Sequence, residues 1–256
     1  MRLDGFLYEK AYFDSRNKAK YAVTHGMVYI DGRQVLKPSF FIDENIGVNI
    51  EIKAEEFFVS VGGYKLSKAL KDFGVSVKDL ICADIGSSTG GFTDCLIVNG
   101  AKKVYAVDIN CEQLHESLKN SEKVVPCEKN VKFLTKSDFG ETIDMIVADL
   151  SFISVTAVLP IFDEILEYGK KAIILIKPQF EVGCKKRFKN GIIRAAEIRR
   201  KTCLSVYDAL FTTNLRPIAV TVTPLCEDKN IEYLLLLEKT GEKILPFETV
   251  FNKELF

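Results

Sequence analysis

The chain of 256 residues contains no tryptophan, two histidines and no cysteine pair of the C-x-x-C kind. Because neither histidine lies near two of the seven scattered cysteines, we expect no metal site. Long apolar runs are also missing. The runs 172–176 and 234–237 have the length of core strands, below the roughly 18 residues of a membrane span. Since the first residues also lack the apolar region of a secretory signal, we expect free thiols and a cytoplasmic protein.

Neither sign of charge is in excess, because 35 lysines and arginines balance 35 aspartates and glutamates. This balance argues against an indiscriminate nucleic-acid-binding protein. Two segments are nevertheless basic: residues 10–37 carry six lysines and arginines against two aspartates, and residues 185–201 carry eight against one glutamate. Local basic segments on a neutral protein suit a bound polyanion, although solvated helix faces would have the same composition.

The first 58 residues have the pattern of a small α+β unit. Apolar residues at helical spacing predict a helix over 3–12, and Asp14 or Ser15 can cap a second helix that ends at Gly26. Asp31-Gly32 predicts the turn of a hairpin over 27–35, and an extended segment follows at 48–55. Beyond this unit, Gly62-Gly63 indicates a bend, and residues 65–74 are expected to form a helix that ends at Gly74.

The order of motifs in residues 2–39 resembles that of the S4 RNA-binding domain. R-L-D is followed by S-R-x-K-A and then by G-x-V-x-I-D-G. The resemblance implies a unit that binds folded RNA mainly through its phosphates, which lysine and arginine neutralise without reading bases. Together with the second basic segment, it makes the following residues candidates for RNA binding: Arg2, Arg16, Lys18, Lys20, Arg33, Lys185, Lys186, Arg187 and Lys189.

From residue 80 onward, strand and helix patterns alternate. Strands are expected at 81–85, 103–109, 142–150, 171–177, 218–223 and 231–238. Helices are expected from residue 92 and over 112–119, 155–168 and 194–212. Such alternation predicts an α/β fold with a mostly parallel sheet, and the two final strands in succession indicate an antiparallel addition, the layout of class I (Rossmann-like) methyltransferases. We therefore divide the chain into 1–58, a connecting segment at 59–79, and 80–256.

A glycine turn follows the first strand of the α/β domain. A dinucleotide-binding turn would need glycine where Ser88 stands, and no G-K-[ST] follows as in a P-loop. A turn without a phosphate cradle fits S-adenosylmethionine, which has no phosphates. Asp108 ends the next strand, where it can accept hydrogen bonds from ribose hydroxyls or cap the helix that follows. The candidate cofactor-binding residues are Asp84, Gly86, Ser87, Ser88, Thr89, Gly90, Gly91, Phe92 and Asp108.

Two further strands end in ionisable residues, Asp149 and Lys177. An ionisable group at the end of an apolar strand costs free energy unless it has a partner or a function, although a lysine can also end a strand for solubility. The D-L-S-F loop at 149–152 lacks the prolines usual in adenine N6-methyltransferases, so the pair points to an oxygen nucleophile. A desolvated lysine can take up the proton of a hydroxyl or orient its lone pair, and a carboxylate beside it can hold it.

Four strings resemble the TlyA family of S4-domain ribosomal RNA cytidine 2′-O-methyltransferases, also called hemolysins. They are V-G-G-Y-K-L-S-K-A-L at 61–70, the segment 84–108, A-D-L-S-F-I-S at 148–154 and I-K-P-Q-F-E at 176–181. The resemblance implies S-adenosylmethionine as cofactor and a catalytic K-D-K-E tetrad, shared with FtsJ-like enzymes. In this sequence the tetrad falls on Lys65, Asp149, Lys177 and Glu232.

The same resemblance implies ribosomal RNA or a ribosomal subunit as the partner. Because the chain is as short as the family members that act on the large subunit, we expect that subunit. Val61 stands where the family usually has arginine, so one RNA or linker contact is in doubt. Two alternatives stay open. A membrane-active hemolysin lacks support from any apolar span, and a non-catalytic RNA-binding assembly factor would not need the intact tetrad.

Overall fold

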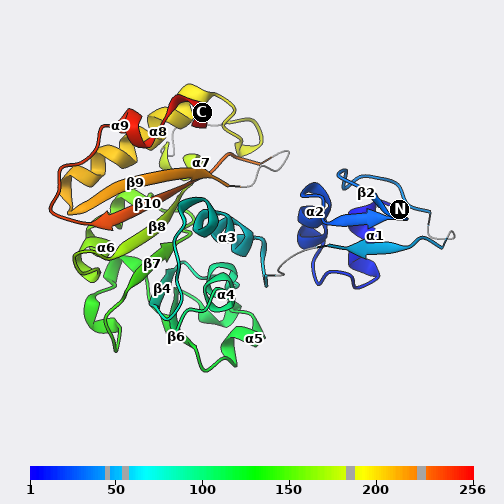
Figure 1. Cartoon of the computed structure of the whole chain (residues 1–256), viewed down its shortest axis with the longest axis horizontal. Helices are drawn as coiled ribbons and strands as arrows, with labels where there is room; N and C mark the ends of the chain where they lie inside the picture. Colours follow the sequence, from blue (N-terminus) through cyan, green and yellow to red (C-terminus); the bar gives the residue numbers. More distant parts are fainter. Residues whose placement is uncertain (44–46, 54–57, 183–187, 224–228) are drawn as a thin grey trace. The chain divides into compact units, whose positions relative to one another are not determined.

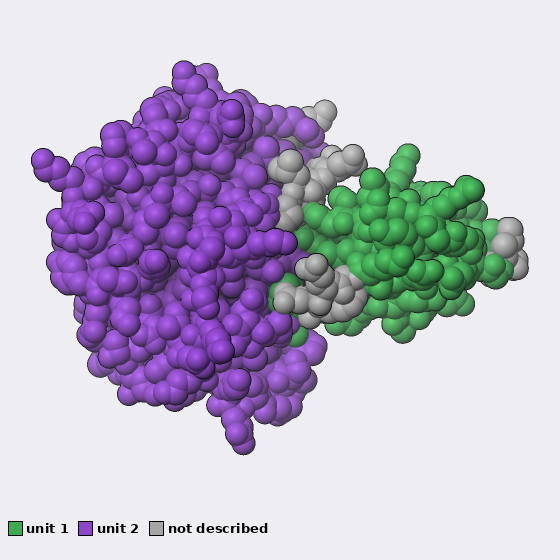
Figure 2. Space-filling model, in the orientation of Figure 1, with its two compact units in different colours: residues 1–61 green, residues 62–256 purple. Residues whose placement is uncertain are grey.

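A computed structural model describes residues 1–43, 47–53, 58–182, 188–223 and 229–256 (Figure 1). The chain divides into two compact units, residues 1–61 and 62–256, which Figure 2 colours separately. In the described part of the chain, no helix combines the length and the apolar character needed to cross a bilayer.

The first unit contains the expected two helices and a hairpin. The helices are α1 (Leu3–Glu9) and α2 (Arg16–Thr24), and the antiparallel sheet has the order β2 (Arg33–Gln34), β1 (Val28–Ile30), β3 (Ile50–Ile52). Ser15 caps α2, since its Oγ accepts the Lys18 amide at 3.2 Å. Asp31 and Gly32 both have positive φ, as the tight turn between β1 and β2 requires. The buried apolar face of these elements forms a core of its own.

The second unit is built on a mixed sheet of seven strands. Its order is β6 (Val124–Glu128), β5 (Lys103–Asp108), β4 (Ile81–Ile85), β7 (Met145–Ala148), β8 (Lys171–Ile176), β10 (Tyr233–Lys239), β9 (Leu215–Val222). The first five of these are parallel, and β10 runs antiparallel to both neighbours. The class I methyltransferase layout with its antiparallel addition is confirmed.

Helices flank this sheet (Figure 1). Side chains of α6 and α8 share one core with β4, β5, β7, β8 and β10. On α3, Lys68 donates to Thr221 Oγ1 of β9 at 3.2 Å, which fixes that helix beside the antiparallel strands. The α-helices are α3 (Val61–Phe73), α4 (Gly91–Val98), α5 (Glu116–Lys119), α6 (Leu159–Ile165), α7 (Pro178–Glu181), α8 (Ala196–Ala209) and α9 (Phe247–Val250). The 3-10 turns are η1 (Cys111–Gln113), η2 (Val131–Phe133), η3 (Lys136–Asp138), η4 (Val155–Ala157), η5 (Lys189–Gly191), η6 (Leu210–Thr212) and η7 (Lys253–Leu255).

Several local predictions were wrong. Gly62 and Gly63 lie in the first turn of α3 instead of forming a bend. The helix expected over 112–119 is split into η1 and the short α5, because His115 breaks it with extended backbone and caps α5 itself. Strand β6 was not predicted at all. It is an edge strand that contains Pro126 and alternates buried with exposed residues only weakly, so it carries little strand signal.

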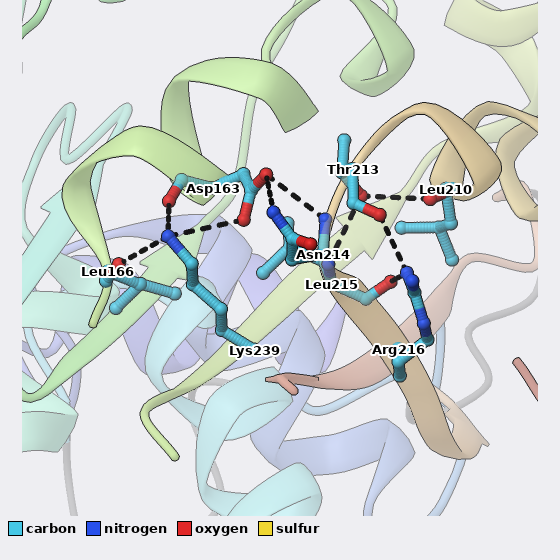
Figure 3. Close-up of polar contacts among 8 residues, drawn as sticks. All are labelled: Asp163, Leu166, Leu210, Thr213, Asn214, Leu215, Arg216 and Lys239. Atoms are coloured by element: carbon cyan, nitrogen blue, oxygen red, sulfur yellow. Dashed lines mark hydrogen bonds and ion pairs between the residues drawn. The ribbon is translucent and has the colours of Figure 1, made fainter. Parts of the chain in front are cut away.

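A polar cluster joins α6 to the ends of β9 and β10 (Figure 3). Asp163 Oδ2 accepts the Asn214 amide at 3.0 Å, and Lys239 Nζ donates to the Leu166 carbonyl at 2.9 Å. The cluster lies where β8 begins, since Glu238 of β10 pairs with Lys171. These contacts therefore hold the edge of the sheet opposite to the carboxyl ends of the parallel strands.

Candidate active site

The predicted catalytic residues and the glycine turn lie at the carboxyl edge of the parallel strands. The register pairs Ile85 with Val107 and with Ala148, so the residues that follow these strands emerge side by side. In folds of this kind, ligands bind outside the carboxyl ends of the strands. A cavity of about 480 Å³ lies there.

The cavity is lined by residues from five segments of the chain. They are Ile85, Gly86, Ser88, Val107, Asp108, Ile109, Gln113, Lys129, Asn130, Val131, Lys132, Asp149, Leu150, Ser151, Phe152 and Ile153. Of the predicted cofactor-binding residues, Gly86, Ser88 and Asp108 are therefore on its wall. The side contributed by residues 129–132 was missed, because the preceding strand β6 was not predicted.

The glycine turn between β4 and α4 requires glycine at two places. Gly86 has a φ of +85°, and a Cβ there would lie 2.9 Å from the Asp149 carbonyl oxygen. Gly90 has a φ of +91°, and a Cβ there would overlap the Leu118 side chain. Ser88 also has positive φ, at 49°. At Gly86 the turn thus packs its backbone directly against Asp149, just after β7, where a larger residue would displace the loop that carries Asp149.

Asp108 points its carboxylate at the glycine turn. Its Oδ2 accepts the Ser88 amide at 2.9 Å and its Oδ1 accepts the Asn110 amide at 3.1 Å. The alternative role as a helix cap belongs to Asn110, whose Oδ1 accepts the Glu112 amide at the start of η1. Each Asp108 oxygen retains a second lone pair for a ligand hydroxyl.

Asp84 lies below the turn and not on the cavity wall. It is fully buried, and its Oδ2 accepts the Thr93 hydroxyl at 2.6 Å, which ties β4 to α4. Burial raises the pKa of Asp84 to about 7, even though the hydrogen bond from Thr93 acts in the opposite direction. Asp84 therefore shapes the turn from the core side. Thr93 was missed by the sequence analysis, although it follows the predicted turn directly.

The structure brings the four tetrad residues together. Lys65 Nζ lies 2.7 Å from Glu232 Oε2 and 3.8 Å from Asp149 Oδ2. Lys177 Nζ forms an ion pair with Asp149 Oδ1. Asp149 is thus shared between the two lysines. The side chains are largely withdrawn from solvent, with 10% of Lys177 and 13% of Glu232 exposed. Two amines and two carboxylates balance in charge, which offsets part of the cost of burying them.

Two neighbours of the tetrad were not predicted. Ser151 Oγ accepts from Lys177 Nζ at 3.0 Å, and Gln179 Nε2 donates to Glu232 Oε1 at 3.0 Å. Both residues stand in the strings D-L-S-F and K-P-Q-F, so their position in the sequence held the signal. Ser151 also lines the cavity, and through it and Asp149 the Lys177 amine is connected to the cavity wall.

Several predicted RNA-binding cations have carboxylate partners. Arg2 and Arg16 both contact Asp4, and Lys18 Nζ lies 2.7 Å from Asp14 Oδ2. Burial raises the pKa of Asp4, but its hydrogen bonds to the two arginines outweigh burial and the net shift is downward.

Lys20 and Arg33 have no carboxylate partner in the described part of the first unit. Lys185, Lys186 and Arg187 lie outside the described residues. Lys189 begins η5.

Two protein-family models match the chain. Residues 58–239 match the model of the FtsJ-like methyltransferase family, and residues 1–45 match that of the S4 domain. The FtsJ-like match includes all four tetrad residues and the glycine turn.

Curated relatives match over most of the chain. "Hemolysin A" of Brachyspira hyodysenteriae is 40% identical, with 91% of this chain and 98% of the relative covered. The "16S/23S rRNA (cytidine-2'-O)-methyltransferase TlyA" of Mycobacterium tuberculosis is 34% identical, with 95% and 92% covered. The "23S rRNA (cytidine-2'-O)-methyltransferase TlyA" of Campylobacter jejuni is 35% identical, with 76% and 81% covered.

Solved structures superimpose on this chain. A Streptococcus thermophilus protein that is named as a hemolysin superimposes with a TM-score of 0.73 at 35% identity, with 100% of this chain and 94% of that chain covered. The N-methyltransferase NodS of Bradyrhizobium japonicum, in complex with S-adenosyl-l-homocysteine, superimposes with a TM-score of 0.51 at 13% identity, with 71% and 89% covered. At that identity the likeness concerns the fold alone.

Proposed function

The chain belongs to the FtsJ-like methyltransferase family, and from this premise we propose that it methylates the ribose 2′-hydroxyl of a cytidine in ribosomal RNA with S-adenosylmethionine. One observation carries the proposal. The Lys177 amine, at the end of β8, is held by Asp149 and Ser151, and both of these residues form part of the cavity wall. An amine fixed in this way suits the activation of a hydroxyl.

The cavity fits the cofactor. Gly86, packed against Asp149, and Ser88 border the cavity, and Ser88 stands where a pyrophosphate-binding turn would need glycine. Asp108 would accept hydrogen bonds from the ribose hydroxyls, and Ile109 and Val131 offer apolar surface to the adenine. When bound, S-adenosylmethionine supplies an electrophilic methyl group on a positively charged sulfur.

The residues of the tetrad would orient the hydroxyl and take up its proton. Lys177 Nζ orients the 2′-oxygen and, in its neutral form, takes up the proton that the hydroxyl loses. Asp149 stabilises the ammonium group that forms. Lys65 and Glu232, joined at 2.7 Å, orient the ribose and extend the proton network. Holding the hydroxyl in line with the methyl group supplies a large part of the rate enhancement.

The parts of the chain would divide RNA binding and catalysis between them. We assign residues 1–58 to RNA recognition, residues 59–79 to a connection that carries Lys65, and residues 80–256 to catalysis. Lys20 and Arg33 are the cations of the first unit that we expect to contribute most to phosphate binding, since Arg2, Arg16 and Lys18 are paired within the unit. We favour the large ribosomal subunit as substrate and the cytoplasm as the location.

The test is methyl transfer by the purified protein. Labelled S-adenosylmethionine is incubated with isolated large and small ribosomal subunits, and the modified ribose is mapped. Lys177→Met should abolish transfer while calorimetry still detects cofactor binding. Lys171→Met, at the other end of the same strand, is the matched control and should retain activity. Full turnover by Lys177→Met would refute the role of this amine, and the lack of transfer by wild-type protein to either subunit would refute the function.

A further inference from the structure

The Lys177–Asp149 pair joins residues that follow two different strands, so its geometry depends on how these two segments are held together. Lys177 is the N-cap of α7, and Asp149 opens the segment 149–155 that leads from β7 to η4. We propose that Glu181 is a positioning residue for methyl transfer, which holds the segment 149–155, and with it Asp149 and Ser151, against Lys177. This inference rests on the proposed function and deepens it.

Glu181 bridges the two segments directly. It is the last residue of α7, four positions after Lys177. Its Oε1 accepts the Val155 amide at 2.8 Å, and its Oε2 accepts the Ser154 hydroxyl. Both partners belong to the far end of the segment 149–155. Because α7 is a single rigid turn, a contact at Glu181 fixes the distance between this segment and Lys177.

Leu150 and Val155 anchor the segment in the core, but few polar contacts hold the residues between them. In the described structure, the amides of residues 150–154 donate no backbone–backbone hydrogen bond, since the ladder of the sheet ends at Asp149. Phe152 adopts a φ of +67°, a conformation that costs a bulky residue about 1–3 kcal/mol. Such a conformation persists only where the surroundings impose it. The Lys177–Ser151 and Glu181 contacts hold the segment on either side of Phe152, whose ring also contacts that of Phe180.

The environment of Glu181 is unusual for a residue with a merely structural task. Burial raises its pKa, and the hydrogen bonds from Ser154 and Val155 only partly offset this effect. The described residues offer it no ion pair. Among the described residues, these two hydrogen bonds are the polar contacts that compensate the burial of the carboxylate, which is costly without partners. Both of its side-chain hydrogen bonds go to the segment 149–155, and none goes to another described residue.

The experiment measures methyl transfer to ribosomal subunits by Glu181→Ala and Glu181→Gln. Glu181→Ala should lower kcat by about 10–100-fold, since small displacements of a reacting group have effects of this size. The KM for RNA should change less than about threefold. Glu181→Gln should restore most of the activity, because its amide oxygen can accept the Val155 amide while its NH₂ group donates to Ser154.

Asp163→Ala is the matched control. Asp163 also accepts hydrogen bonds from a backbone amide and a side chain, both of Asn214, but it lies at the opposite edge of the sheet (Figure 3). It should lower the melting temperature and leave kcat unchanged. Ser154→Ala removes one of the two Glu181 contacts, so it should lower kcat in the same way as Glu181→Ala, and it provides the test if Glu181→Ala fails to fold.

The outcomes separate the inference from the proposed function. An inactive wild-type protein would overturn both. With an active wild type, an unchanged kcat in Glu181→Ala would overturn the inference alone. The same holds if Glu181→Gln is as impaired as Glu181→Ala, or if Asp163→Ala loses as much kcat. A selective loss of kcat with rescue by glutamine supports Glu181 as a positioning residue.

Discussion

Replacing Gly86 by alanine should damage the protein in two separable ways. The residue has a φ of +85°, which alanine adopts only with strain. Its new Cβ would also lie 2.9 Å from the Asp149 carbonyl oxygen and 3.1 Å from Leu150 Cδ2. The carbonyl belongs to the backbone and cannot rotate away. We therefore expect either the glycine turn or the Asp149 segment to move, and the cavity wall to move with it.

Gly169→Ala provides the control that separates these effects. Gly169 has a φ of +81°, nearly the same as that of Gly86, but nothing lies within 4 Å of the position that a Cβ would take there. Both variants should share the backbone strain of about 1–2 kcal/mol. Gly86→Ala should lose a further 1–3 kcal/mol or so, the usual cost of overpacking. The difference between the two variants therefore measures the clash alone.

The assay is chemical unfolding of both variants, together with calorimetry of S-adenosylmethionine binding. Gly169→Ala should bind the cofactor like the wild type, since it lies at the other end of the sheet, where its amide contacts Lys239. Gly86→Ala should bind about tenfold more weakly or worse, a loss of at least about 1.4 kcal/mol. Equal unfolding free energies for the two variants, with unchanged cofactor affinity in Gly86→Ala, would refute the close packing of the turn against Asp149.

Two further predictions concern the acids near the turn. The pKa of Asp84 is raised from 3.8 to about 7, so its contribution to stability is complete below pH 4 and is lost as the pH rises to 7. At about 1.4 kcal/mol per pKa unit, this contribution amounts to about 4 kcal/mol. Relative to the wild type, Asp84→Asn should therefore gain unfolding free energy over that pH range, and parallel curves for the two proteins would contradict this. Asp108→Ala should weaken cofactor binding at least tenfold by calorimetry, and an unchanged Kd would exclude Asp108 as a ligand.

The sequence was most informative where periodicity and turn chemistry agree. The strand Ile81–Ile85, the glycine turn after it and the cap at Ser15 follow from local rules, because an apolar run, glycine and a small polar residue each act on their own neighbours. The strand β6 and the split helix at 112–119 do not follow from such rules. Pro126 and the weak alternation of β6 contradict a strand locally, and it forms because β5 offers it a complete set of partners.

The candidate site shows the same division. Lys177 and Asp149 were found because a charge at the end of an apolar strand is visible in the sequence. Lys65 and Glu232 were found only through family resemblance, since neither ends a predicted strand. The contacts of Ser151, Gln179 and Glu181 were not foreseen at all, because a hydrogen bond across two loops depends on backbone geometry that no local pattern records.

The direction of β10 explains how Glu232 reaches the site. Tyr233, its first residue, pairs with Ile176 at the carboxyl end of β8, and Glu238, near its end, pairs with Lys171 at the start of β8. A parallel strand in this place would put Glu232 at the opposite edge of the sheet. The antiparallel strand instead delivers a carboxylate beside Lys177, where it can pair with Lys65 from α3. The one reversed neighbour of the parallel strands is therefore what completes the tetrad.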